Sequence, residues 1–123
     1  MKNPNIDNAT LVRAIIEGAQ EKKAHQIVHV DLEGIEYAPT QGFVIVNGNS
    51  PIQVDAIADS IREYVEKKIG IRPYNYDGYQ NSQWIVIDYG TIYAHVFLPA
   101  FRERYNLEQL WNDATITEVP DLE

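Results

Sequence analysis

The feature that most restricts the fold of this chain is a pair of β-branched and aromatic runs, residues 84–89 and 92–98, separated by Gly90-Thr91. A Gly-X pair between two such runs is typical of a two-residue type II′ hairpin turn. This loop predicts the strand pairs Tyr89–Ile92, Asp88–Tyr93, Ile87–Ala94, Val86–His95, Ile85–Val96 and Trp84–Phe97.

The hairpin has two distinct faces, because successive side chains of a strand point to opposite sides of the sheet. One face is predicted to be core and consists of Ile85, Ile87, Tyr89, Ile92, Ala94 and Val96. The other, which we call the aromatic face, consists of Trp84, Val86, Asp88, Tyr93, His95 and Phe97. Aromatic side chains mixed with one acid and one imidazole are more typical of a recognition surface or a partly covered layer than of a plain interior.

The composition is that of one globular domain. A chain of 123 residues can bury roughly two-thirds of its unfolded surface in a single core. Its hydrophobic fraction of 45% and its strand-length apolar runs disfavour disorder and a membrane-spanning helix. The absence of cysteine excludes a disulfide framework and thiolate metal sites and indicates a reducing compartment. Because residues 1–5 resemble neither a signal core nor a transit segment, we expect a cytoplasmic protein.

The net charge of −8 bears on the choice of partner. Nucleic acid requires a basic surface for its phosphates, so direct binding to nucleic acid is disfavoured. The charge favours a basic partner, although many soluble proteins are acidic for colloidal reasons.

The remaining patterns predict an α/β fold, a single-domain mixed β-sheet with packed helices in the order α-β-β-α-β-β-β-α-α. The first helix is capped by Asp7 or Asn8, and strands are expected at 27–32 and 43–46. The second helix has the clearest boundaries. They are Ser50 as N-cap, Pro51 at the first position, Gln53 completing a capping box, and Gly70 as the C-terminal stop.

The last part of the chain shows weaker signals. Residues 72–79 predict a short edge strand and a turn leading into the hairpin. After the hairpin, residues 99–105 predict a helical turn, and Asn106 with Gln109 can cap a second short helix. Residues 113–123 have no helical stripe. We therefore expect one domain over residues 1–112 and a peripheral or frayed C-terminal tail over 113–123.

Several stretches, in order along most of the chain, resemble the ribosomal silencing factor family, also called RsfS or Iojap-like proteins. They are Lys23-Ala24 with Ile27-Val28 and Asp31; Phe43-Val44-Ile45 with Gly48 and Ser50; Gln53 to Asp59; Trp84 to Gly90; Val96 between His95 and Phe97; and Arg102-Glu103 with Tyr105, Leu107, Leu110 and Trp111. One departure stands before the second strand. This chain has Gln41-Gly42 where the family usually has an Asp-Tyr pair, and the preceding loop is one residue longer.

The resemblance implies a nucleotidyltransferase-like fold without nucleotidyltransferase chemistry and without a cofactor. Proteins similar to this one bind the large ribosomal subunit through ribosomal protein L-fourteen, block joining of the small subunit and repress translation when nutrients are short. An acidic binder for a basic ribosomal protein agrees with the net charge. The alternatives are a non-catalytic module with another basic partner and, with less support, a nucleotide-handling enzyme.

The enzyme alternative lacks its carboxylates. A nucleotidyltransferase needs a Gly-Ser turn followed by paired carboxylates on a nearby strand to hold two metal ions. Gly48-Asn49-Ser50 resembles such a turn, but the next acids, Asp55 and Asp59, lie on the solvent-exposed face of a predicted helix rather than on a strand. His25 and His29 do not form a metal pair either, because in a strand they lie about 13 Å apart. We therefore expect no catalytic residue and no metal ligand.

The resemblance and the aromatic face together predict a partner-binding site formed by Trp84, Asp88, Tyr89, Tyr93, His95, Phe97, Arg102 and Glu103. Within it, Asp88 and His95 are diagonal neighbours, roughly 7–8 Å apart between backbones. Two interpretations are equally supported, a structural Asp–His hydrogen bond and a functional acid–imidazole pair. In a rival interpretation, the C-terminal helices cover the aromatic face, and the partner binds the hairpin tip at residues 89–91.

Family members are often homodimers, and the Tyr-rich edge at residues 74–79 can pair two copies of this chain across a two-fold axis.

Overall fold

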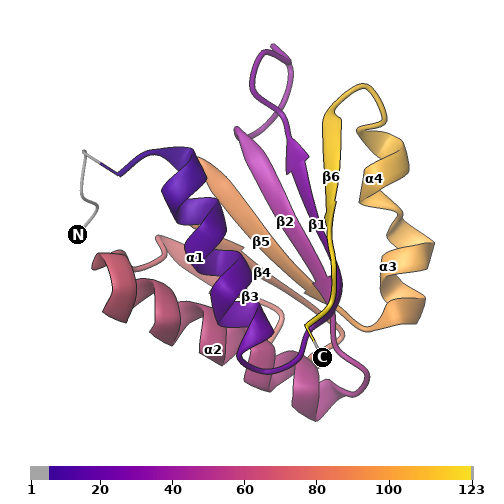
Figure 1. The fold of residues 1–123 in the computed structure, drawn as a ribbon. Coiled ribbons are helices and arrows are strands. Elements are labelled where there is room, and N and C mark those ends of the chain that lie inside the picture. Colours follow the sequence, from indigo (N-terminus) through magenta and orange to yellow (C-terminus); the bar gives the residue numbers. More distant parts are fainter. Residues whose placement is uncertain (1–5, 123) are drawn as a thin grey trace.

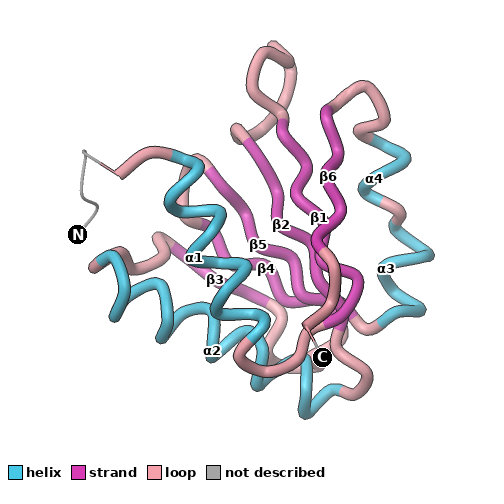
Figure 2. Tube along the Cα trace, viewed as in Figure 1, coloured by secondary structure: helices cyan, strands magenta, loops and turns pink. Residues whose placement is uncertain are grey.

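The computed structural model describes residues 6–122, which form four helices and six strands within that range. The elements are α1 (Asn8–Gln20), β1 (His25–Asp31), β2 (Gly42–Asn47), α2 (Pro51–Ile69), β3 (Asn75–Asp77), β4 (Trp84–Asp88), β5 (Ile92–Phe97), α3 (Pro99–Tyr105), α4 (Leu107–Leu110) and β6 (Thr115–Val119). Figures 1 and 2 show their arrangement. Among the described residues, no helix is both long and apolar enough to cross a membrane.

The hairpin register is confirmed. Strands β4 and β5 are antiparallel, with Trp84 opposite Phe97 and Asp88 opposite Tyr93. The Tyr89 amide donates to the Ile92 carbonyl at 3.0 Å, which closes the loop at Gly90-Thr91. Gly90 has a φ of +86°, a conformation that favours glycine, so the turn residue and the register agree.

The strands form one mixed sheet in the order β3-β4-β5-β2-β1-β6. Strand β2 runs parallel to β5, and the other neighbouring pairs are antiparallel. The predicted α/β class is therefore confirmed, and the nine expected elements occur in the expected order. Helix α2 connects β2 to β3 at one edge of the sheet. The hairpin strands β4 and β5 then lie between β3 and β2.

The boundaries of α2 are confirmed in detail. The Ser50 hydroxyl accepts from the Gln53 amide at 3.1 Å, and Pro51 begins the helix. The Gln53 side chain accepts from the Asn49 amide at 2.7 Å, one residue earlier than in the usual capping box. Gly70 ends the helix in the left-handed conformation with a φ of +70°.

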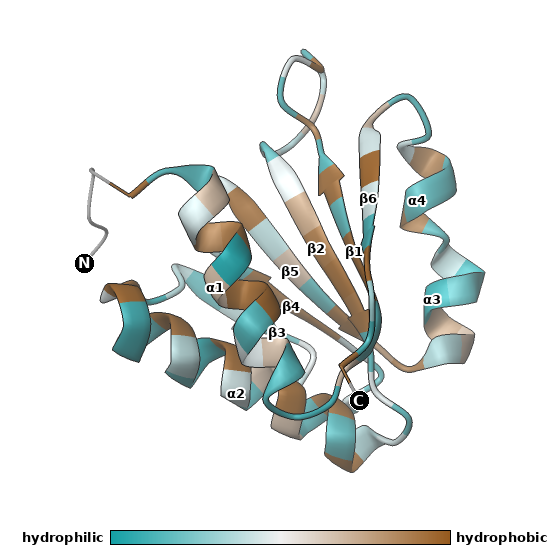
Figure 3. Cartoon of the chain, in the orientation of Figure 1, coloured by the Kyte–Doolittle hydropathy of each residue, from teal (hydrophilic) through white to brown (hydrophobic). Residues whose placement is uncertain are grey.

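Helices α1 and α2 cover one face of the sheet (Figure 1). Hydrophobic and hydrophilic residues alternate along both helices (Figure 3), as expected for helices that bury one stripe. The buried stripe packs on the predicted core face of the hairpin. All six residues of that face, Ile85, Ile87, Tyr89, Ile92, Ala94 and Val96, belong to this main core cluster.

The C-terminal tail contains a strand, β6, that the sequence patterns did not predict. Strand β6 pairs antiparallel with β1, with Ile116 opposite Val30 and Val119 opposite Ile27. The tail was expected to be peripheral or frayed; β6 is a mostly exposed strand at the edge of the sheet. The signal was available, because residues 115–119 are rich in β-branched side chains between the polar pair Asn112-Asp113 and Pro120.

Gly42, part of the departure from the family pattern, is buried at the start of β2. A Cβ at this position would lie 3.1 Å from the Ile92 Cδ1 atom and 3.1 Å from the Val30 carbonyl oxygen. A residue without a side chain therefore fits the packing of this chain.

Candidate functional site

Helices α3 and α4 cover only part of the aromatic face. Their side chains Phe101, Leu107 and the following Trp111 pack on a second core cluster, formed by Val28, Val30, Leu32, Phe43, Ile45 and Phe97. This cluster lies over β1, β2 and the end of β5. Strand β4 and the adjoining start of β5 belong to the part of the face with half-exposed side chains.

Three residues of the predicted binding site are buried. Phe97 is 0% exposed, His95 is 5% exposed, and Tyr89 is 2% exposed on the opposite, core face of the hairpin. Side chains with so little accessible surface offer almost no contact area, which disfavours them as direct partner contacts in this structure. As the rival interpretation expects, side chains of α3 and α4 pack on the cluster that contains Phe97.

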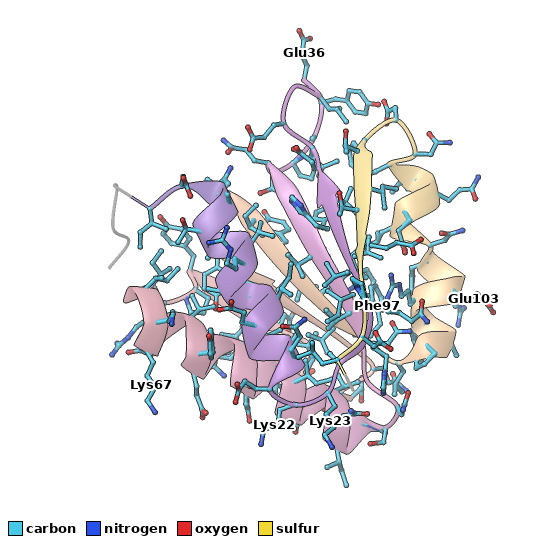
Figure 4. All side chains as sticks on the ribbon, viewed as in Figure 1. Lys22, Lys23, Glu36, Lys67, Phe97 and Glu103 are labelled. Atoms are coloured by element: carbon cyan, nitrogen blue, oxygen red, sulfur yellow. The ribbon has the colours of Figure 1, made fainter. Side chains whose placement is uncertain are left out.

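The half-exposed side chains of the hairpin lie on the aromatic face. Trp84, Val86, Asp88 and Tyr93 are half-exposed. Tyr105 of α3 is exposed, and its ring centroid lies 4.7 Å from that of Trp84. We call Trp84, Val86, Asp88, Tyr93 and Tyr105 the exposed aromatic patch. Glu103 is also exposed on α3, and it points outward in Figure 4.

Asp88 and His95 do not pair, and both interpretations of them as a pair are wrong. The Asp88 carboxylate accepts from the Gly90 amide at 2.7 Å and so caps the hairpin turn. His95 bonds its other diagonal neighbour, since the Trp84 indole N–H donates to His95 Nδ1 at 3.0 Å. The indole N–H is a donor only, so Nδ1 accepts and the neutral ring carries its proton on Nε2.

The environment of His95 keeps the imidazole neutral. Burial among aromatic rings lowers the pKa of His95 from 6.5 to about 3. The ring makes an edge contact with Phe43 at a centroid distance of 4.7 Å, and Nε2 has no hydrogen-bond partner among the described residues.

Arg102 acts as an internal clamp rather than as a free contact. Its guanidinium donates to the Gln26 carbonyl, to Asn47 Oδ1 at 3.1 Å and to Glu108 at 2.7 Å, and its side chain is only 11% exposed. These bonds tie α3 and α4 to the ends of β1 and β2. These bonds give Arg102 a structural role, which is to fix the helices that border the exposed aromatic patch.

The polar residues weighed for metal or catalytic roles have structural partners. Asp55 accepts from the Ser82 hydroxyl at 2.9 Å, and Asp59 accepts from the Tyr79 hydroxyl at 2.8 Å. Both bonds fasten α2 to the segment before β4. His25 Nδ1 lies 3.2 Å from Asp121 Oδ2, while burial lowers the pKa of His29. Within residues 6–122, no three His, Asp or Glu side chains gather closely enough to hold a metal ion.

Comparison with known proteins agrees with the resemblance. The model of the family described as "Ribosomal silencing factor during starvation" matches residues 5–123. The ribosomal silencing factor RsfS of Halalkalibacterium halodurans is 35% identical over 114 residues, which cover 93% of this chain and 96% of that protein. The chloroplastic protein Iojap of Zea mays is 34% identical over 107 residues, covering 87% of this chain and 46% of that protein.

Solved structures share the fold. A crystal structure of a Chromobacterium violaceum protein superposes with a TM-score of 0.81 at 27% identity and covers 87% of this chain and 88% of that one. A Bacillus halodurans crystal structure gives a TM-score of 0.74 at 34% identity and covers 94% of this chain and 99% of that one. The chain therefore belongs to the ribosomal silencing factor family, RsfS.

Proposed function

We propose that this protein binds the large ribosomal subunit through ribosomal protein L-fourteen, blocks joining of the small subunit and so represses translation under nutrient limitation. Membership of the ribosomal silencing factor family supports the proposal. The mechanism is occlusion, since a protein held on the joining face of the large subunit competes with the small subunit for that surface.

The observation that carries the choice of surface is the incomplete cover of the aromatic face. Trp84 and Tyr93 remain half-exposed, and the exposed Tyr105 of α3 lies against Trp84. Aromatic side chains in a well-packed patch are the usual anchors of protein interfaces. Asp88 and Glu103 lie on the hairpin and on α3 and supply negative charge toward a basic partner. We therefore assign the partner contact to the exposed aromatic patch and Glu103.

Two variants test this surface. We expect Tyr93→Ala to weaken binding to purified large subunits by about 2 kcal/mol, the usual loss for a central aromatic anchor. We expect Asp88→Lys to weaken binding as well, more strongly at low salt, because it reverses a charge facing a basic partner. Co-sedimentation with large subunits over a salt series measures both effects.

The controls lie on the helix-covered side. Glu63→Lys makes the same change of charge on α2, and Ile52→Ala truncates an exposed apolar residue of the same helix. Both are expected to bind as the parent does. If Tyr93→Ala and Asp88→Lys also bound like the parent while changes at Gly90-Thr91 abolished binding, the hairpin tip would be the site.

The same proposal assigns a regulatory rather than a catalytic role. Asp55 and Asp59, the acids after the Gly-Ser turn, are held by hydroxyl groups rather than directed at a common point. We expect incubation with Mg²⁺ and each nucleoside triphosphate to leave the nucleotides intact, as measured by pyrophosphate release. Sustained release that disappears in Asp88→Ala would support the enzyme alternative.

We also propose that two copies pair through the edge of β3. This strand lies at the end of the sheet, and its residues Asn75–Asp77 are all exposed. Tyr74 and Tyr76 there are 66% and 45% exposed. An exposed edge offers unpaired backbone groups that a second β3 can complete around a two-fold axis.

A further inference from the structure

His95 is a buried polar group in a cluster that is otherwise apolar and aromatic. Its imidazole lies between Phe43 and Phe97, with ring centroids 4.7 and 6.1 Å away. Its one hydrogen bond in the structure is the bond to the Trp84 indole N–H, at 3.0 Å. The other ring nitrogen, Nε2, is buried without a partner among the described residues.

This arrangement costs stability. A buried N–H without an acceptor is destabilising by about 1–3 kcal/mol, whereas an aliphatic side chain at the same position would fill the space without that cost. The imidazole therefore needs an explanation other than packing. Among the described residues, its hydrogen-bond partner is Trp84, a residue of the exposed aromatic patch.

Ring contacts alone do not fix the indole of Trp84. It stacks on Phe97 at a centroid distance of 5.0 Å and lies tilted against Tyr105 at 4.7 Å. Stacked rings tolerate rotation within their planes, because dispersion and area burial have little directionality. A hydrogen bond from the indole N–H is directional and selects one orientation. It therefore decides which edge of Trp84 is presented at the surface.

We propose that His95 is a positioning residue that orients the indole of Trp84 for binding of the ribosomal partner. This inference rests on the function proposed above. The neutral imidazole acts through Nδ1 and does not touch the partner itself. By fixing the indole before binding, it removes a loss of side-chain freedom that would otherwise accompany association.

The test uses two substitutions of His95 and one of Trp84. His95→Leu removes the acceptor, whereas His95→Asn keeps an acceptor oxygen near the position of Nδ1. Trp84→Phe keeps an aromatic ring but removes the donor. For each variant we would measure affinity for large subunits, urea unfolding, and hydrogen exchange of the indole N–H by nuclear magnetic resonance. Loss of one of the two indole signals in Trp84→Phe identifies the signal of Trp84.

The expected results separate positioning from general stability. His95→Leu should lower affinity about three- to tenfold, the value of one hydrogen bond, and speed exchange of the Trp84 indole N–H without lowering resistance to urea. His95→Asn should restore both affinity and protection. In the Trp84→Phe background, His95→Leu should change affinity no further.

Two contrary results have different meanings. If His95→Leu sped indole exchange but left affinity unchanged, while Tyr93→Ala still weakened binding, the positioning role would be refuted and the proposed function would stand. If the parent protein itself failed to co-sediment with large subunits, the proposed function would fail, and this inference would fail with it.

Discussion

Replacing Ile87 with aspartate is expected to unfold the domain. Ile87 is 0% exposed, and its side chain belongs to the core beneath α1 and α2. The substitution removes a fully buried aliphatic group and places a carboxylate in surroundings without a partner for it. Such changes cost more than about 4 kcal/mol, a large part of the 5–15 kcal/mol that stabilises a typical domain.

The control for this substitution lies on the neighbouring strand. Tyr93 is half-exposed on the other face of the sheet, so Tyr93→Ser should leave the domain folded with a modest loss of stability. Circular dichroism and urea unfolding of both variants would measure the difference. If Tyr93→Ser unfolded the domain and Ile87→Asp did not, the assignment of the two faces would be wrong.

Acidification is expected to destabilise the parent protein through His95. Burial alone lowers the pKa of His95 from 6.5 to about 3. Between these pH values, His95 binds a proton in the unfolded chain but not in the folded protein. The contribution to stability is complete above pH 6.5. As the pH falls from there toward 3, this residue reduces the free energy of unfolding by about 1.4 kcal/mol per pH unit.

The variant His95→Leu isolates this effect. Burial lowers the pKa of His29 as well, which adds a loss of the same sign, but that loss persists in the variant. Urea unfolding of both proteins at several pH values between 7 and 4 should therefore give a shallower decline for His95→Leu. Parallel curves would mean that His95 is protonated as readily in the folded protein as in the unfolded chain.

The parts of the fold that local chemistry determines were predictable. The Gly90-Thr91 pair and the period of two in the flanking strands determine the hairpin register, because a shift by one residue would expose the whole core face. Ser50, Pro51 and Gly70 determine the ends of α2 in the same way, through hydrogen bonds and backbone angles that involve only neighbouring residues.

The parts that depend on distant contacts were not predictable from the same patterns. Strand β6 becomes a strand by pairing with β1, far away in the chain, and its residues are mostly exposed. The cover of the aromatic face depends on where Phe101 and Trp111 pack. The residues of α3 and α4 show that these helices have an apolar side, but not which half of the sheet that side meets.

The candidate site illustrates the same limit at atomic scale. In the predicted register, His95 has two diagonal neighbours on its face, Asp88 and Trp84. Charge favours Asp88, and the sequence therefore predicts only the Asp88–His95 pair. The Asp88 carboxylate instead accepts a hydrogen bond from the Gly90 amide, and His95 Nδ1 accepts one from the indole N–H of Trp84. The strand register does not determine these two hydrogen bonds, so the choice required the structure.

The position of the parallel pair has a consequence for biosynthesis. Gly42 in β2 pairs with Ile92 in β5, so the centre of the sheet closes only after most of the chain has been made. Helices α3 and α4 follow later still. A nascent chain that stops after residue 98 therefore lacks the cover for Phe43, Ile45 and Phe97, and such an uncovered cluster favours aggregation or capture by a chaperone. Complete burial of this cluster therefore waits for α3 and α4, and the pairing of β6 with β1 waits for a still later part of the chain.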